Sequence, residues 1–514
     1  MKMRKQSVFY NAFFLCLSSV GLQCIGFVYR IGLSRFGGAQ VMGMYQLIMP
    51  AYSVIMSFTM SGLTLAVSRL CAQYQAKGDG DGVRGVVRFS QLVFLCLFCC
   101  AAFCVFLFPD FIAGTVLGEP KIKMALLLLL PCLFLTGFEN IFKSCFHGVK
   151  YILPPIVSEL TEQLVRTVAG LGLLIVLCPK DPGVATALIV LGMVISEVFS
   201  VLILTSFYRK AGDRVFGPQR QTKIPKGMFR KVAAIAVPVS SAGLLNNFLS
   251  STTTILIPNR LMAAGVSAQE AMSSFGVMVG MTMPLLMLPT AFIHPLTTVL
   301  LPRFSQYSTQ KDLAQTKRKA GKAIQVTSML IAASLAVMVP LGRTLAQMIY
   351  KQPAAGEHIL PLCAAAFFTF YHITTGSILN GIGMQKQASA SIVVTGISEI
   401  LFTWMSVGRM GIGGYALACI GSELVGVTMN FYWVIKATQI RIQWKNWFAT
   451  PFLSGAAAGC CAWLVFSTLI RQGCPQIPAT LSGIGTAIAV FGLSLSFLGI
   501  RVWDYFRKLY AKQR

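Results

Sequence analysis

The chain has 514 residues, of which 55% are hydrophobic and only 11% are charged, and its mean hydropathy is +0.70. Soluble domains carry about 25% charged residues, so this composition excludes a water-soluble fold. The formal net charge of +27 could indicate nucleic-acid binding, and only the positions of the basic residues along the chain can decide that point.

Apolar segments long enough to cross a membrane recur from one end of the chain to the other. About 20 residues are needed to cross a hydrocarbon core of about 30 Å, and fourteen segments meet this requirement. They are 8–28, 44–66, 89–108, 124–142, 156–177, 184–207, 232–256, 273–301, 323–340, 359–379, 388–407, 414–435, 449–470 and 479–500. We therefore predict an all-α, polytopic membrane protein with about 14 transmembrane helices.

The basic residues alternate between the two sides of this predicted topology. If the N-terminus is cytoplasmic, 32 of the 43 Lys and Arg residues fall in the N-terminus, the cytoplasmic loops and the tail. This is the pattern of the positive-inside rule, with added attraction to anionic lipid headgroups. We predict that both termini are cytoplasmic, that anionic lipids are partners and that nucleic acid is not. The first apolar segment is too long for a signal peptide and is predicted to remain as a helix.

The longest basic connector, 209–231, predicts a cytoplasmic linker between two six-helix lobes, 1–208 and 232–436. It carries eight Lys and Arg residues. Residues 437–514 then hold helices 13 and 14 and a basic cytoplasmic tail, and we expect these two helices to be peripheral.

Short matches at a nearly constant offset indicate that the two lobes are repeats. Arg30 and Arg260 are 230 positions apart, as are Leu130-Pro131 and Leu360-Pro361. Because each repeat has an even number of spans, the two would be related by an axis along the membrane normal and enclose a central cavity.

Carboxylates within the predicted spans are the strongest functional signal, because each costs about 2.5 to 3.5 kcal/mol at a helix centre. Six of the sixteen acidic residues lie there: Glu139, Glu159, Glu162, Glu197, Glu399 and Glu423. Glu159, Glu162 and Arg166 are spaced i, i+3 and i+7 and so share one helix face. They form either a structural ion pair with a neutral Glu159 or a site that binds substrate or exchanges H⁺ or Na⁺, and we favour the second. Glu399 is a further candidate for ion coupling, and Glu139 for substrate binding.

Arginines near helix ends are candidates for contact with phosphate. Arg30 and Arg35 end the first span and Arg260 ends the seventh. Arginine holds phosphate and pyrophosphate in a bidentate manner, although arginines at helix ends also extend to the membrane interface. Asn246 and Asn247 make the seventh span polar, either for substrate or for hydrogen bonds between helices.

Enzymatic chemistry is not indicated. No Walker loop, zinc-ligand spacing or nucleophile elbow occurs in the sequence, and His147, His294 and His372 are each distant in sequence from any carboxylate at ligand spacing. The fifteen cysteines lie mostly in apolar spans and are interpreted as packing residues. We predict no enzyme, no metal and no cofactor, with H⁺, Na⁺ or the membrane potential as the driving force.

Two segments resemble a known family. Residues 26–70, GFVYRIGLSRFGGAQVMGMYQLIMPAYSVIMSFTMSGLTLAVSRL, and residues 145–166, CFHGVKYILPPIVSELTEQLVR, are similar to stage V sporulation protein B and related polysaccharide-biosynthesis transporters. The resemblance covers the first twelve helices. It implies the multidrug/oligosaccharidyl-lipid/polysaccharide flippase superfamily, whose two six-helix lobes form a V-shaped cavity that opens alternately to each face.

Within that superfamily, lipid II flippases of the MurJ/MviN type carry cavity arginines near the ends of helices 1 and 8 and an arginine pair in helix 2. By resemblance, Arg30 and Arg303 stand near the first two sites. Met56 and Ser57 stand where the pair would be, which leaves the lipid-linked glycan open.

The resemblance implies a flippase in the bacterial plasma membrane for an undecaprenyl-pyrophosphate-linked saccharide, used in cell-wall, polysaccharide or spore-cortex synthesis. Two alternatives are a cation-coupled multidrug exporter and a scaffold that docks glycan-synthesis enzymes without transport.

Overall fold

The computed structural model describes residues 8–215, 227–293, 304–306 and 312–498. Within these ranges every regular element is a helix, and twelve helices are long and apolar enough to cross a membrane. The predicted all-α, polytopic fold is confirmed. The chain divides into two compact units, Met1–Gly276 and Val277–Arg514.

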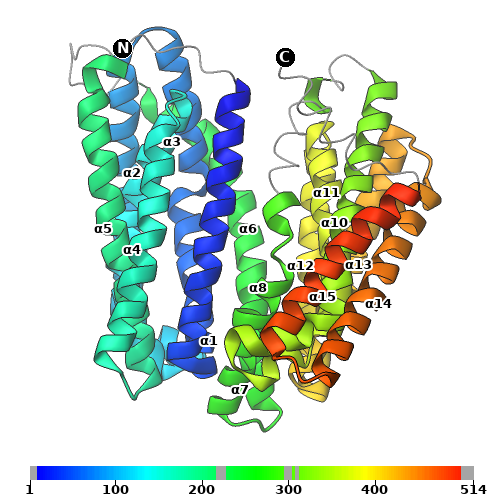
Figure 1. Cartoon of the computed structure of the whole chain (residues 1–514). Helices are drawn as coiled ribbons and strands as arrows, with labels where there is room; N and C mark the ends of the chain where they lie inside the picture. The colour runs from blue at the N-terminus through cyan, green and yellow to red at the C-terminus, as the bar shows by residue number, and fades with distance from the viewer. Residues whose placement is uncertain (1–7, 216–226, 294–303, 307–311, 499–514) are drawn as a thin grey trace. The chain divides into compact units, whose positions relative to one another are not determined.

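The N-terminal unit is a bundle of long helices (Figure 1). Its elements are α1 (Val8–Ala76), α2 (Gly80–Leu107), α3 (Lys123–Gly148), α4 (Leu153–Leu177), α5 (Pro182–Val215), α6 (Met228–Ala263) and α7 (Ala268–Phe275), with two short turns, η1 (Phe111–Val116) and η2 (Pro120–Ile122), between α2 and α3. Helix α1 packs against α2, α3, α4 and α6, while α5 packs against both α3 and α4. Side chains on α3, α4 and α5 can therefore meet.

Helix α1 contains two of the predicted spans. Two helices join at Gly38, whose φ of 80° and ψ of −179° are helix-breaking angles that glycine adopts readily. The candidate span within α1, Ser18–Ala76, has 59 residues, or about 88 Å if it were one straight helix at 1.5 Å per residue, far more than a core of about 30 Å requires. The predicted spans 8–28 and 44–66 therefore lie on two helices, one on each side of the kink at Gly38.

Close approach of α1 and α6 depends on small residues, as is common between membrane helices. The Gly62 N–H donates to Ser240 Oγ at 3.0 Å, and a Cβ at Gly62 would lie 2.0 Å from the Ala236 carbonyl oxygen. About three helical turns away from this contact, the Ser53 and Ser251 hydroxyls lie 3.3 Å apart. A larger residue at position 62 would push the two helices apart.

The C-terminal unit begins within the short π-helix η3 (Gly276–Thr282), because Gly276 is the last residue of the N-terminal unit. It continues with α8 (Met283–Leu286), α10 (Leu313–Tyr350), α11 (Ile359–Gly381), α12 (Gln385–Met410), α13 (Ile412–Thr438), α14 (Thr450–Arg471) and α15 (Gln476–Phe497). Helix α10 packs against α11, α14 and α15, and α13 packs against α11 and α12. Asp312 caps α10 by accepting from the Gln315 N–H at 3.0 Å. Buried Phe370, Tyr371 and Trp447 belong to the apolar core of the C-terminal unit.

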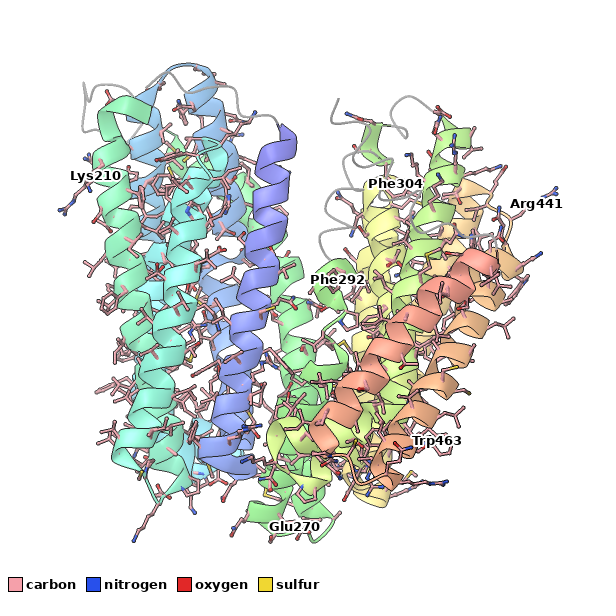
Figure 2. The ribbon with its side chains drawn as sticks, in the orientation of Figure 1. Lys210, Glu270, Phe292, Phe304, Arg441 and Trp463 are labelled. Atoms are coloured by element: carbon pink, nitrogen blue, oxygen red, sulfur yellow. The ribbon has the colours of Figure 1, made fainter. Side chains whose placement is uncertain are left out.

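Most of the predicted spans correspond to single helices. Span 273–301 is the exception, because its described part is divided among the end of α7, η3 and α8, and residues 294–301 lie outside the described residues. Exposed basic side chains, such as Lys210 on α5 and Arg441 after α13, project away from the helices (Figure 2).

The predicted boundary between lobes is not tested. Residues 216–226 of the predicted linker lie outside the described residues, and α6 packs on α1 within the N-terminal unit, which extends to Gly276. The division into two six-helix repeats stays a prediction.

Candidate functional site

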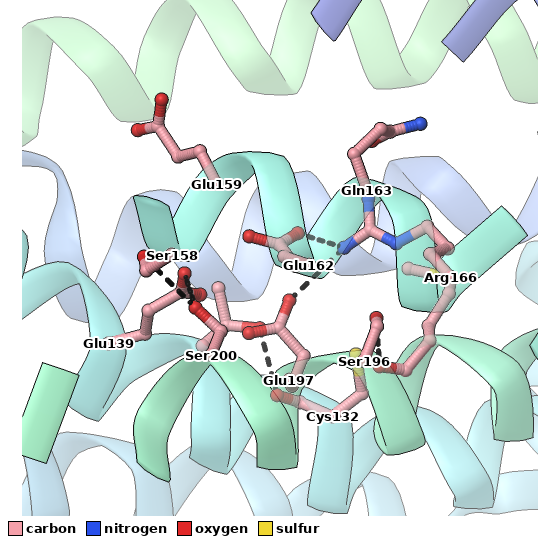
Figure 3. A network of polar contacts seen from close by, with 12 residues as sticks. Cys132, Glu139, Ser158, Glu159, Glu162, Gln163, Arg166, Ser196, Glu197 and Ser200 are labelled. Carbon is pink, nitrogen blue, oxygen red and sulfur yellow. Dashed lines mark hydrogen bonds and ion pairs between the residues drawn. The ribbon is translucent and has the colours of Figure 1, made fainter. Parts of the chain in front are cut away.

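Six charged side chains from three helices meet inside the N-terminal unit, and we call them the N-terminal network. They are Glu139 and Lys143 on α3, Glu159, Glu162 and Arg166 on α4, and Glu197 on α5. Figure 3 shows Glu162 and Glu197 both directed toward the Arg166 guanidinium, where they contact the same nitrogen, Nη2.

Lys143 contacts three of the carboxylates. Its Nζ lies 2.6 Å from Glu139 Oε1, 3.4 Å from Glu162 Oε2 and 3.6 Å from Glu159 Oε1. The lysine side chain is only 13% exposed, so these contacts are little screened by solvent. Lys143 is therefore the internal counter-ion that links α3 to α4.

Arg166 links α4 to α5. It forms an ion pair with Glu162 one turn earlier on the same helix, and its Nη2 lies 3.3 Å from Glu197 Oε1. Arg166 Nε and Glu197 Oε2 are buried and have no hydrogen-bond partner within the described part of the chain. The Arg166 guanidinium thus keeps one donor, and Glu197 one acceptor, for a further ligand.

Serine hydroxyls complete the buried end of the N-terminal network. Ser200 on α5 donates to Glu139 Oε1, and its Oγ lies 3.2 Å from Ser158 Oγ on α4. Glu139, Ser158 and Ser200 are almost completely buried. These contacts fix the Glu139 carboxylate and leave the half-exposed Glu159 as the outer edge of the network.

The N-terminal network has more carboxylates than fixed cations. One carboxylate oxygen from each of Glu139, Glu162 and Glu197 lies within 4.8 Å of the other two. Two unit charges at that separation repel by about 3 to 4 kcal/mol at an effective dielectric constant of about 20. With only Lys143 and Arg166 as fixed counter-ions, the arrangement favours retention of a proton or binding of a small cation.

The structure brings four of the predicted site residues together. The predicted pair of Glu162 and Arg166 is present. Glu139, predicted as a substrate contact, lies in the same network as Glu159 and Glu162. Glu159 does have a partner, Lys143, which comes from a different helix.

The predicted phosphate-binding arginines are more dispersed. Arg30 is half-buried on α1, a helix that packs against α4 of the N-terminal network. Arg35 is exposed, and Arg260 is half-buried in the last turn of α6. Arg303 lies outside the described residues.

Two amides and one carboxylate among the predicted residues lie elsewhere. On α6, Asn246 is exposed and Asn247 half-buried. Glu399 belongs to the C-terminal unit, where it accepts from the Tyr415 hydroxyl at 3.3 Å.

Two residues of the sites escaped the sequence analysis. Lys143 was assigned to a short cytoplasmic loop, but it lies inside α3 and is buried against carboxylates; its i, i+4 spacing from Glu139 was the available signal. His372 lies 51 positions before Glu423, so no ligand spacing in the sequence pairs them, yet its Nδ1 is 2.8 Å from Glu423 Oε2.

Comparisons with curated proteins agree with the membrane fold. Stage V sporulation protein B from Bacillus subtilis (strain 168) is 24% identical over 461 residues, covering 87% of each chain. Lipid II flippase MurJ from the same organism is 21% identical over 547 residues, covering 97% of this chain and 98% of that protein.

Solved structures show the same fold. A lipid II flippase MurJ in an inward closed conformation matches with a TM-score of 0.66 and 14% identity, covering 97% of this chain and all of that one. An inward-facing multidrug resistance MATE family transporter of the MOP superfamily also matches with a TM-score of 0.66, at 15% identity, covering 82% and 98%.

The family model described as polysaccharide biosynthesis protein matches residues 8–308, more than half of the chain. Together with twelve helices suited to a membrane and a charged network enclosed by three of them, this match shows that the chain is a multi-pass membrane protein that belongs to the polysaccharide biosynthesis protein family.

Proposed function

We propose that this protein is a flippase that moves an undecaprenyl-pyrophosphate-linked saccharide from the cytoplasmic to the outer leaflet of the bacterial plasma membrane. The observation that carries the proposal is the end-to-end similarity to a lipid II flippase, over 97% of this chain and 98% of that protein. The saccharide would cross intact, so no covalent step is required of the protein.

The chemistry of such a substrate suits the charged and polar residues of this chain. Its polyprenyl tail stays in the hydrocarbon phase, so only the sugar and the pyrophosphate need polar contacts. Arg30 and Arg260 are the proposed pyrophosphate contacts, because guanidinium groups hold phosphate oxygens in a bidentate manner. Asn246, Asn247 and Arg35 are proposed as secondary contacts with the sugar or the phosphate.

We assign the N-terminal network to coupling. Alternating access requires that a ligand favour one conformation over another, and a proton or Na⁺ arriving among Glu139, Glu159 and Glu162 would change their pairing with Lys143 and Arg166. The excess of carboxylates over fixed cations supports this role.

A cation-coupled multidrug exporter is the second candidate. It is favoured by the TM-score of 0.66 with a multidrug resistance MATE family transporter, and a carboxylate-lined site without phosphate-binding arginines would suffice for it. A scaffold that docks glycan-synthesis enzymes is the non-transport alternative.

Reconstitution in proteoliposomes separates these three functions. A fluorescent undecaprenyl-pyrophosphate disaccharide is placed in the inner leaflet, and its headgroup is probed with an impermeant quencher, with and without a pH or Na⁺ gradient. A flippase raises the quenched fraction above that of protein-free vesicles, and Ser206→Ala, an exposed change on α5, should behave like wild type.

Equal quenching with and without protein, together with ion-driven efflux of a cationic dye, would instead identify an exporter. No transport of either compound would leave the scaffold.

A further inference from the structure

A second polar cluster lies in the C-terminal unit, around His372 on α11. Its Nδ1 is 2.8 Å from Glu423 Oε2 on α13, and its Nε2 is 3.2 Å from Ser391 Oγ on α12. Ser391 Oγ in turn donates to the Gly426 carbonyl oxygen at 3.1 Å. One imidazole therefore connects three helices.

Two protonation states satisfy the hydrogen bonds of this cluster. Ser391 has one hydroxyl hydrogen. When it is directed to Gly426, Ser391 Oγ accepts from His372 Nε2, and the hydrogen bond between Nδ1 and Glu423 Oε2 needs a second proton, on either the ring or the carboxyl group. When it is directed to Nε2, a single ring hydrogen on Nδ1 satisfies Glu423, and the pair is a neutral imidazole beside an ionised carboxylate.

Loss of that proton has a defined structural consequence. The remaining ring hydrogen must face Glu423 from Nδ1, because a bare nitrogen lone pair would otherwise oppose the carboxylate. Nε2 then becomes an acceptor, and the Ser391 hydroxyl must turn from Gly426 to His372. The orientation of one hydroxyl group reports whether the proton is bound.

The surrounding charges favour a bound cation. Glu423 and Glu399 line one cavity of about 160 Å³, together with hydroxyls of Ser422 and Thr369. Within the described residues neither carboxylate forms an ion pair with Lys or Arg. The cavity has room for several waters, which gives protons a route to Glu423.

Among the described residues, no Lys or Arg forms a contact with His372 or Glu423 from the helices packed around α11. Near the cavity, the titratable groups are Glu423, Cys419 and Tyr415 on α13 and Glu399 on α12. The other titratable groups of these two helices, Tyr432, Lys436, Lys386 and Arg409, lie toward the helix ends. From α10 the polar partners of α11 are hydroxyls, which stay neutral, and α8 lines the cavity with Met283 and Leu286.

An unused donor lies next to the ring. Thr395 Oγ1 is 7% exposed and has no hydrogen-bond partner in the described structure. A Cβ at Gly426 would meet Thr395 Oγ1 at 2.2 Å and His372 Nε2 at 3.0 Å. The absence of a side chain at Gly426 keeps the space between them open, so the Thr395 hydroxyl is placed to donate toward Nε2 when that nitrogen carries no hydrogen.

We propose that His372 and Glu423 form a proton-binding site of the C-terminal unit, in which Ser391 signals occupancy to α13 through the Gly426 carbonyl. In atom balance, the protonated pair releases the hydrogen on Nε2 to water, and the hydrogen shared between Nδ1 and Glu423 Oε2 stays on Nδ1, which leaves neutral His372 and ionised Glu423. The site does not depend on which substrate the protein moves.

Infrared difference spectroscopy on the full-length protein in lipid vesicles, cycled between two buffer pH values without substrate, tests the site directly. Wild type should show one imidazole and one carboxyl signal from this pair, in addition to carboxyl signals from the N-terminal network. His372→Gln should lose both signals of the pair, Glu423→Gln should lose the carboxyl signal of the pair, and Ser391→Ala should keep proton uptake but shift the imidazole band.

His358→Gln is the matched control, since His358 caps the start of the same helix, away from the cluster. Its spectrum should retain both signals. The proposal is overturned if the His372→Gln spectrum equals that of the control, or if Na⁺ at constant pH reproduces the wild-type change. Should His372→Gln not remain monodisperse, Ser391→Ala decides in its place, and an imidazole band that stays at its wild-type position would then overturn the proposal. A failure of lipid transport would leave this result unaffected.

Discussion

Replacing Lys143 by Met tests whether the N-terminal network is held by an internal counter-ion. Its ammonium lies 2.6 Å from Glu139, whose side chain is 2% exposed, and within 3.6 Å of two more carboxylates. Removing one partner of a buried ion pair costs about 3 to 5 kcal/mol, because the other charge is left uncompensated. We expect Lys143→Met to lower the free energy of unfolding by that amount.

Lys123 provides the matched control on the same helix. Its Nζ lies 2.8 Å from Asp110, but the two side chains are 44% and 78% exposed, and exposed ion pairs contribute only about 0 to 1 kcal/mol. Lys123→Met should therefore change the unfolding free energy by less than about 1 kcal/mol.

The assay is equilibrium unfolding by SDS in mixed micelles, followed by circular dichroism. The double variant Lys143→Met with Glu139→Gln should recover part of the loss, because Glu139 is then neutral, while Glu159 and Glu162 still lack their counter-ion. Equal losses for Lys143→Met and Lys123→Met would refute the reasoning, since burial would then have no effect on the value of the pair.

Three further predictions concern transport and topology. Arg30→Ala and Arg260→Ala should each slow headgroup translocation in proteoliposomes, and Lys at either position should restore part of the rate; wild-type rates for both Ala variants would make the arginines interfacial anchors. If Glu162 and Arg166 serve coupling, Glu162→Gln should fold normally yet flatten the dependence of transport on pH or Na⁺. The double variant Glu162→Gln with Arg166→Gln should then stay inactive. Recovery of stability and activity in the double variant would instead indicate a structural pair. A single cysteine at Lys210 in a cysteine-free background should react with an impermeant maleimide only after the cells are opened, and labelling of intact cells would contradict cytoplasmic placement.

The sequence was sufficient for the helices and for contacts within one helix. Apolar length predicts membrane spans because the hydrocarbon core has a fixed thickness, and i, i+4 spacing predicted the pair of Glu162 and Arg166. A helical period gives no information on which faces of different helices meet. The contacts of Lys143 with α4 and of Arg166 with Glu197 therefore required the packing of α3, α4 and α5.

The helices of the first two spans extend beyond their apolar parts. Apolar length alone separates 8–28 from 44–66, because the intervening residues include Arg30, Arg35 and four glycines. The backbone nevertheless continues as helix on both sides of Gly38. Polarity marks where a chain leaves the hydrocarbon core, whereas hydrogen bonding decides where the helix ends.

The two polar clusters differ in what neutralises them. In the N-terminal network two of the counter-charges, Lys143 and Arg166, are covalently fixed and can change partner but cannot leave. Around His372 the described structure holds no fixed Lys or Arg partner, so the charge that balances Glu423 must be exchangeable. Because an uncompensated charge within the membrane costs several kcal/mol, loss of that proton would favour any conformation that brings water or another cation to Glu423. A fixed cation favours one arrangement of helices, whereas an exchangeable one lets the preferred arrangement change during a transport cycle.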